Sequence, residues 1–188
     1  MEPATVLVAG EGADDIGLQC GGWTIEWQGG RGPITEGTTI VDGLQRSEHG
    51  LDTVHEPSGR FAETTRAPYG VVVLAEPPNS EGSGDRADLT LPVEDLELVK
   101  RVRRHVDRLV LVLVTGRPLI LDSVIDHCDA IVAAWLPGSE GDGIADVLTG
   151  AAPFTGRLPR RWHEPEGSVD HPTSWKQPLW DRGHGMVT

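Results

Sequence analysis

Residues 69–75 read YGVVVLA, a run with no charged side chain and a single polar one, that of Tyr69. A run that is apolar on both faces and bounded by turn residues is typical of a central strand in a parallel sheet. Three further runs have strand character: residues 6–9, 109–114 and 130–134. Residues 51–55, which contain fewer apolar side chains, are a possible short strand. These runs predict a sheet with YGVVVLA near its centre.

Stretches with helical period separate the strand candidates, and they cover residues 39–46, 93–106 and 143–148. The second stretch places Val99, Val102 and Val106 at helical spacing. This alternation predicts an α/β fold, a three-layer sandwich in which helices flank a mainly parallel sheet. After Gly150 the sequence is rich in Pro, Trp and Gly without a clear period, which predicts an irregular C-terminal arm.

The length and charge of the chain limit its organisation and its partners. The 188 residues suffice for one well-buried domain and are short for two, so we expect a single domain over residues 1–188. The formal net charge of −13 repels nucleic acid and anionic membrane surfaces, so neither is an expected partner. A basic cluster at residues 100–108 falls at the end of a predicted helix, where cations complement the helix dipole.

The opening of the chain and its two cysteines indicate the compartment. The start, MEPATVLVAG, has no basic region followed by a long apolar stretch, and no segment approaches the roughly eighteen apolar residues that span a bilayer. We therefore expect no signal peptide and a cytoplasmic location. Cys20 and Cys128 form neither a disulfide framework nor a metal-ligand spacing, so we expect two buried free thiols.

Two tryptophans lie four residues apart between glycine pairs in GGWTIEWQGG, residues 21–30. A tryptophan face stacks on the C–H face of a sugar ring, and neighbouring glycines let the ring stand clear of the backbone. Trp23 and Trp27 are therefore candidates for sugar binding. The alternative is a core position for one or both, and for Trp23 this is at least as well supported.

The stretch AEPPNSEGSGD, residues 75–85, follows the central strand and so lies at its carboxyl end, the edge where open α/β sheets bind ligands. Its acids are Glu76, Glu81 and Asp85. A glutamate in such a loop can act as a general acid, although a solvated loop explains the same composition. No histidine lies close to these acids, so we expect no metal and no other cofactor.

Three other motifs are interpreted as structural. Arg117, in VTGRP, lies at a strand end and is placed to pair with an acid. Glu140, in the turn PGSEG, lies near the positive end of the following helix. The stretch EGADD at residues 11–15 lacks the further glycines of a dinucleotide fingerprint and the Gly-Lys-Ser/Thr of a phosphate loop.

Taken in order, these motifs resemble a known family. The series GGWTIEWQG, GTTIVDGL, AEPPNSEGSGD with DLTLP, VTGRP, AAWLPGSEG, IADVLTG and FTGRLPRRW is similar to the second domain of family 3 glycoside hydrolases. The plant-type β-D-glucan exohydrolases and related β-glucosidases are the most similar members. The resemblance covers practically the whole chain, from about Val6 onward.

The resemblance implies a site shared between two domains. Members typically have a TIM-like barrel that carries an aspartate nucleophile, followed by an α/β sandwich that contributes the acid/base glutamate across the domain interface. By motif match Glu81 would be this acid/base, Trp27 one wall of the sugar clamp at the aglycone subsite, and Trp23 its support. The ligand would be a β-glucoside or a β-glucan oligosaccharide.

Only MEPAT precedes Val6, so we expect the barrel to be absent from this chain and the isolated chain to be inactive. Retaining hydrolysis needs two carboxyl groups roughly 5–5.5 Å apart, and Glu76 or Asp85 is a poor substitute for the nucleophile because both share a short loop with Glu81. The first hypothesis is the acid/base domain of a retaining, exo-acting β-glucosidase or β-glucan glucohydrolase that docks on a separately encoded barrel. The alternatives are a stand-alone β-glucoside-binding module and an inactive truncated relic.

Overall fold

The structure is a computed structural model that describes residues 4–47, 51–162 and 178–186. Five parallel strands form one sheet in the order β2-β1-β3-β4-β5. The strands are β1 (Ala4–Ala9), β2 (Leu51–His55), β3 (Ala67–Ala75), β4 (Val106–Val114) and β5 (Ala130–Trp135). The helices are α1 (Ile16–Cys20), α2 (Ile40–Arg46), α3 (Val93–Arg103) and α4 (Gly141–Thr149). Every strand expected from the sequence is confirmed.

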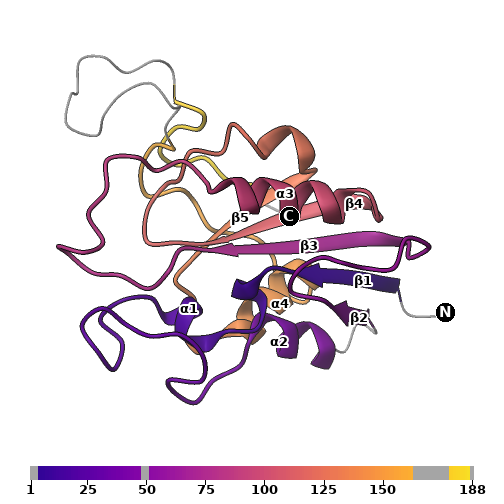
Figure 1. The fold of residues 1–188 in the computed structure, drawn as a ribbon, viewed down its shortest axis with the longest axis horizontal. Helices are drawn as coiled ribbons and strands as arrows, with labels where there is room; N and C mark the ends of the chain where they lie inside the picture. The colour runs from indigo at the N-terminus through magenta and orange to yellow at the C-terminus, as the bar shows by residue number, and fades with distance from the viewer. Residues whose placement is uncertain (1–3, 48–50, 163–177, 187–188) are drawn as a thin grey trace.

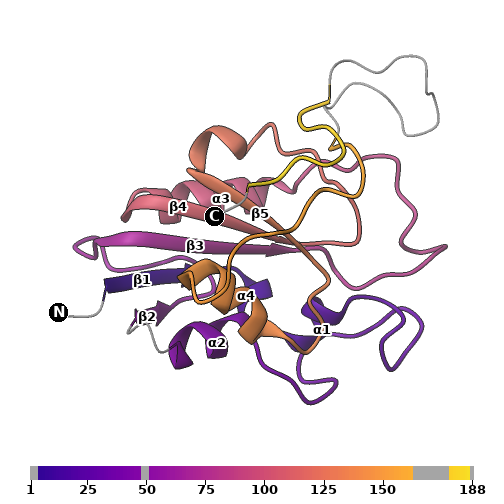
Figure 2. The same cartoon turned by 180° about the vertical axis from the view of Figure 1, so that it is seen from behind.

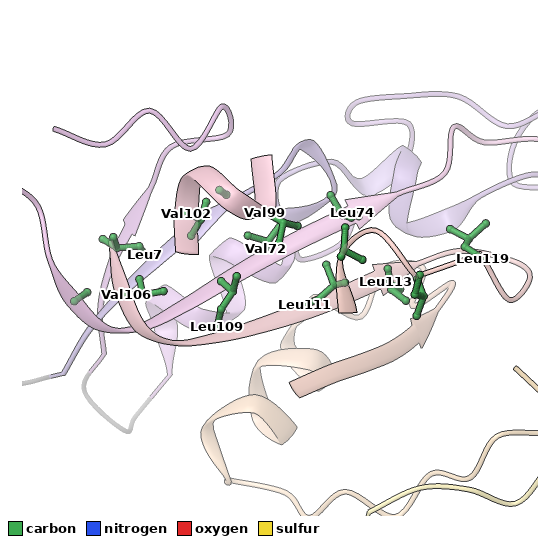
Figure 3. Packing of buried hydrophobic residues seen from close by; sticks show 14 of the residues in the cluster. Leu7, Val72, Leu74, Val99, Val102, Val106, Leu109, Leu111, Leu113 and Leu119 are labelled. Carbon is green, nitrogen blue, oxygen red and sulfur yellow. The ribbon is translucent and has the colours of Figure 1, made fainter. Parts of the chain in front are cut away.

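Helices cover both faces of the sheet, as the three-layer prediction requires. Helix α3 lies on one face, and α2 and α4 lie side by side on the other (Figures 1 and 2). Alternate residues of β3 face the two layers: Val72 and Leu74 belong to the core cluster under α3, and Val71 and Val73 to the cluster under α2 and α4. Figure 3 shows the first cluster. This double burial explains why YGVVVLA has no polar alternation.

The predicted helix over residues 93–106 is wrong at its end. Helix α3 ends at Arg103, and Val106 is the first residue of β4, where it pairs with Ala67 in the ladder. Val106 is nevertheless buried in the same cluster as Val99 and Val102. Val106 is therefore buried as the helical period predicts, although it belongs to a strand and not to the helix. Three cations of the basic cluster, Lys100, Arg101 and Arg103, occupy the last turn of α3, whereas Arg108 lies in β4.

Short-range signals fix the segment around α1 and α2. Asp15 caps α1, a helix that the sequence did not suggest, by accepting the Leu18 N–H over 2.9 Å. Thr39 and Asp42 form a capping box at the start of α2. The fully buried Gln19 donates to the carbonyls of Thr38 and Gly138 and accepts the Ile40 N–H. Because all of its side-chain bonds join separate segments, Gln19 holds the base of the long loop between α1 and α2.

The C-terminal arm is irregular in its described part, as expected, but it completes the core. Trp162 is 1% exposed and its Nε1–H donates to the Leu119 carbonyl over 2.8 Å. Its ring lies against Trp135, with ring centroids 5.8 Å apart, and against Trp180, at 6.1 Å. The arm thus covers the α3 side of the sheet near β5 rather than leaving the fold.

Cys20 and Cys128 are both free and partly buried. Burial raises the pKa of the Cys20 thiol and raises that of Cys128 to about 11, so both remain protonated near neutral pH. The described helices are short, at most 11 residues in α3, and none of them is long and apolar enough to cross a membrane. The described residues contain no group of three His, Cys, Asp or Glu side chains arranged to hold a metal ion.

Candidate functional site

Two loops meet at the carboxyl edge of the sheet, at the left in Figure 1: the tryptophan loop (residues 21–30) after α1 and the glutamate loop (residues 76–85) after β3. Glycines allow their backbones to touch. A Cβ added at Gly22 would lie 2.1 Å from the carbonyl O of Asn79. Gly29 has φ +73°, and a Cβ there would lie 2.9 Å from the Cβ of Pro78. The glycine pairs of GGWTIEWQGG therefore serve loop contact as well as ring exposure.

Gln28 and Ser80 join the two loops through hydrogen bonds. The Ser80 N–H donates to Gln28 Oε1 over 3.0 Å, and the Ser80 hydroxyl donates to the Trp27 carbonyl. Gln28 Nε2 reaches the carbonyl O of Glu81 over 3.4 Å. Sequence reasoning singled out neither residue, and a lone glutamine or serine in a loop gives no signal of such a role.

The structure brings together the three residues that the sequence proposed for the site. Trp23 Nε1–H donates to Glu81 Oε2 over 3.1 Å. The rings of Trp23 and Trp27 have centroids 6.4 Å apart with planes inclined at 55°. Trp23 is 70% exposed and Trp27 52% exposed, so the alternative of a core position is wrong for both. Two tilted aromatic faces can stack on sugar rings, and the carboxylate beside them can exchange a proton with the bound ligand.

The tryptophan loop holds its shape with strained backbone. Trp23 and Ile25 have φ of 62° and 64°, a left-handed conformation that side chains with a Cβ rarely adopt. The Trp23 N–H closes the loop by donating to the Trp27 carbonyl over 3.0 Å. Such conformations persist where the surrounding contacts determine them. Ile25, at the tip, is 76% exposed.

The environment of Glu81 favours its ionised form. Its own backbone N–H and the indole N–H groups of Trp27 and Trp23 lower the pKa of the carboxyl, and partial desolvation opposes them less strongly. Glu81 as described is therefore a carboxylate at neutral pH. A general base acts in this ionised form. To act as a general acid, Glu81 must be protonated, which requires a neighbouring group that raises its pKa.

Glu76 and Asp85, the other acids of the glutamate loop, have structural surroundings. The Glu76 side chain is 8% exposed and pairs with Arg117 and with Arg86, each over 3.0 Å. The predicted pairing of Arg117 with an acid is thus confirmed. Asp85 accepts the Gly82 N–H over 3.3 Å and closes the turn that follows Glu81.

A separate cavity of about 450 Å³ lies at the carboxyl ends of β1 and β3, lined also by residues of α3. This is the point where the strand order reverses direction, the usual place of ligand crevices in such sheets. Its wall includes Glu11, Asp95 and Arg101, and none of Trp23, Trp27 and Glu81. No motif of the sequence predicts this cavity.

Burial in this wall raises the pKa of Asp95 to about 6, and the charges of Glu94 and Glu11 act in the same direction. The unfolded chain releases this proton more readily, so stability falls as pH rises from about 4 to about 6. We expect Asp95→Asn to be more stable than the wild type at pH 8, by about 1 kcal/mol because the group is partly solvated, and equal to it near pH 3.5.

Urea unfolding at both pH values measures this difference. The matched control is Glu94→Gln, which removes an exposed acid from the same turn and should change stability by less than about 0.5 kcal/mol at either pH. A stability gain for Asp95→Asn that is equal at pH 3.5 and pH 8 would contradict the assignment of the pKa.

Comparisons with known proteins relate the sequence and the fold of this chain to a domain of glycoside hydrolases. The family model described as "Glycosyl hydrolase family 3 C-terminal domain" matches residues 1–187. A lysosomal β-glucosidase of Dictyostelium discoideum is 31% identical over 96% of this chain and 25% of its own length. A periplasmic β-glucosidase of Salmonella typhimurium is 32% identical over 72% of this chain and 19% of its own length.

Solved structures agree with the sequence comparisons. The exo-1,3/1,4-β-glucanase of a Pseudoalteromonas species superposes with a TM-score of 0.85 at 33% identity, covering 98% of this chain and 25% of that protein. A mutant β-glucosidase of Listeria innocua, solved with laminaribiose, shares the fold with a TM-score of 0.77 at 21% identity, over 99% of this chain and 30% of that protein. The chain spans about a quarter of the length of the first relative and of the exo-glucanase.

Proposed function

The chain belongs to the C-terminal domain family of the family 3 glycosyl hydrolases, and on this basis we propose that it supplies the acid/base residue, Glu81, of a retaining, exo-acting β-glucosidase or β-glucan glucohydrolase. The observation that carries the proposal is the contact of the Glu81 carboxylate with Trp23, beside a second exposed tryptophan at the carboxyl edge of the sheet. A proton-transfer group and two sugar-stacking faces therefore share one surface.

The proposed reaction has two steps in which Glu81 changes its role. In the first, a nucleophilic carboxylate attacks the anomeric carbon while the Glu81 carboxyl gives its proton to the glycosidic oxygen, and the aglycone leaves as an alcohol. In the second, the Glu81 carboxylate takes a proton from water, whose oxygen attacks the anomeric carbon and releases the nucleophile. Glu81 ends protonated and ready for another cycle.

We propose that the nucleophile comes from a barrel domain that docks on this one. The exposed apolar side chain of Ile25, at the tip of the tryptophan loop, suits contact with such a domain, because exposed apolar side chains mark interaction surfaces. The lowered pKa of Glu81 also supports a nucleophile from a second domain. A second carboxylate about 5–5.5 Å away would raise this pKa by like-charge repulsion and so supply the proton-donating form that the free domain lacks.

Trp27 and Trp23 are proposed to bind the aglycone side of a β-glucoside or a β-glucan oligosaccharide. The acid/base residue must touch the oxygen that joins the two sugars, so rings beside it lie next to the leaving sugar. The exposure of both rings in this chain also favours a second candidate function, binding of β-glucosides without any partner.

Complementation separates these candidates. We expect 4-nitrophenyl β-D-glucoside to be hydrolysed by this chain mixed with a separately produced family 3 barrel domain, and by neither component alone. Docking is checked independently by analytical ultracentrifugation. Binding of cellobiose to this chain alone, measured by tryptophan fluorescence, together with a docked but inactive mixture would favour the binding module. Neither binding nor activity in a docked mixture would contradict both.

A further inference from the structure

Arg117 follows β4, and its guanidinium reaches both ends of the glutamate loop. Its Nε and Nη2 donate to Glu76 Oε1 over 3.1 and 3.0 Å. Its Nη1 donates to the carbonyl O of Gly84 over 2.9 Å. Glu81 lies on the stretch between Glu76 and Gly84, so one side chain joins the two ends of the segment that carries the proposed acid/base residue.

The Glu76 end of this bridge is fixed to the sheet. The Glu76 N–H donates to the Val114 carbonyl over 3.0 Å and so continues the ladder between β3 and β4. Its carboxylate is 8% exposed and accepts the hydroxyl of the fully buried Thr115. Arg117 is therefore held against a rigid part of the fold.

The Gly84 end is coupled tightly to Glu81. The Gly84 N–H donates to the Ser80 carbonyl over 2.9 Å, across a turn that contains Glu81. A Cβ added at Gly84 would lie 2.3 Å from Asn79 Oδ1, so the turn is tightly packed at this point. A displacement of Gly84 consequently moves Glu81.

We infer that Arg117 is the residue that positions Glu81, by holding Gly84 against the anchored Glu76 carboxylate. The catalytic meaning of this role rests on the function proposed for Glu81, whereas its effect on the loop does not. The bridge uses Nε, Nη1 and Nη2 of the planar guanidinium, three donor atoms that the single ammonium nitrogen of a lysine does not offer. Gln28 and Ser80 support the other side of the same turn.

Arg86 provides the matched control. It also donates to Glu76 Oε1 over 3.0 Å, yet among the described residues the side-chain hydrogen bond to the Gly84 carbonyl comes from Arg117 and not from Arg86. Replacing Arg86 by glutamine therefore removes a cation from the same carboxylate without cutting the bridge. Replacing Arg117 by lysine keeps the cation and cuts the bridge. If Arg117 only neutralises Glu76, Arg86→Gln should have the larger effect on the loop. If Arg117 positions the loop, Arg117→Lys should have the larger effect.

The first test needs no enzymatic activity. The Trp23 indole N–H donates to Glu81, so its ¹H–¹⁵N signal should follow the ionisation of Glu81 between pH 3 and pH 7. Trp23→Phe assigns this signal among those of the six tryptophans. We expect the amplitude of this titration to fall by at least half in Arg117→Lys and in Arg117→Gln and to persist in Arg86→Gln. An unchanged indole signal of the buried Trp162 shows that a variant is folded.

The second test uses the complemented enzyme. We expect Arg117→Lys to lower kcat on 4-nitrophenyl β-D-glucoside by about 10- to 100-fold, with KM within about threefold of the wild type, since misplacement of a catalytic group by about 1 Å has effects of this size. A folded Arg117→Lys protein with the wild-type Trp23 titration would overturn the inference. An inactive wild-type mixture would instead contradict the proposed function and leave the titration as the test of positioning.

Discussion

Replacing Glu81 by glutamine is expected to lower kcat of the complemented enzyme by about 10²–10⁴-fold on a β-glucoside with a poor leaving group, the usual contribution of general acid–base catalysis. Glutamine keeps the size of the side chain and can still accept the Trp23 indole N–H. It carries no titratable proton, so the loss isolates proton transfer from binding. Steady-state hydrolysis of cellobiose by the mixture measures the effect.

The leaving group distinguishes this role from any other. A 2,4-dinitrophenyl group departs without protonation, so the first step of the Glu81→Gln enzyme should return to near the wild-type rate on this substrate. The second step still lacks a base, and added azide should accelerate it by attacking the anomeric carbon without deprotonation. Asp85→Asn, on the same loop, can still accept the Gly82 N–H and should stay within about threefold of the wild type. A Glu81→Gln enzyme with unchanged cellobiose hydrolysis would contradict the assignment.

Replacing Trp162 by alanine is expected to destabilise the chain by about 3–5 kcal/mol, the range for a fully buried aromatic side chain. The substitution removes the packing against Trp135 and Trp180 and leaves the Leu119 carbonyl without its indole donor. Trp162→Phe keeps most of the packing and should cost about 1–3 kcal/mol through the lost hydrogen bond. Unfolding in urea, followed by circular dichroism, measures both.

Trp27→Ala serves as the control because it removes the same side chain from an exposed position, where the cost should stay below about 1 kcal/mol. A cost for Trp162→Ala as small as that of Trp27→Ala would show that the C-terminal arm contributes little to the core.

The strands could be predicted from the sequence because burial on both faces leaves a local record. Residues such as Val71 and Val72 face opposite layers, so the run has no polar interruption whatever its partners are. The end of α3 could not be predicted in the same way. Val106 fits the helical period of Val99 and Val102, and only its pairing with Ala67 shows that it belongs to a strand.

The tryptophans show where local reasoning stops. Trp23 and Trp162 are the same residue type in sequences rich in small and polar residues, yet one is 70% exposed and the other 1%. The difference is tertiary, since Trp162 meets the Leu119 carbonyl and Trp135, whereas Gly22 lets the loop of Trp23 press against the Asn79 backbone. Both contacts join residues that are far apart in sequence, so no local pattern predicts them.

For the candidate site, the carboxyl-edge rule predicted that the acidic loop would face ligand space, and the family resemblance suggested Glu81, Trp27 and Trp23. The pairing of Arg117 with an acid was also expected. Its second contact, with Gly84, and the Gln28–Ser80 connection were not, because each depends on how two loops approach in space.

The burial of Trp162 also bears on how the chain acquires its structure during synthesis. The cluster under α3 includes Leu7, from β1, and Trp162, which lies well after β5 in the sequence. A nascent chain that has emerged only as far as β5 therefore exposes apolar surface that nothing yet covers, a situation that invites chaperone binding or aggregation. Folding should thus reach completion only after translation has passed the arm, and the high sequence separation of these contacts should make that last event slow.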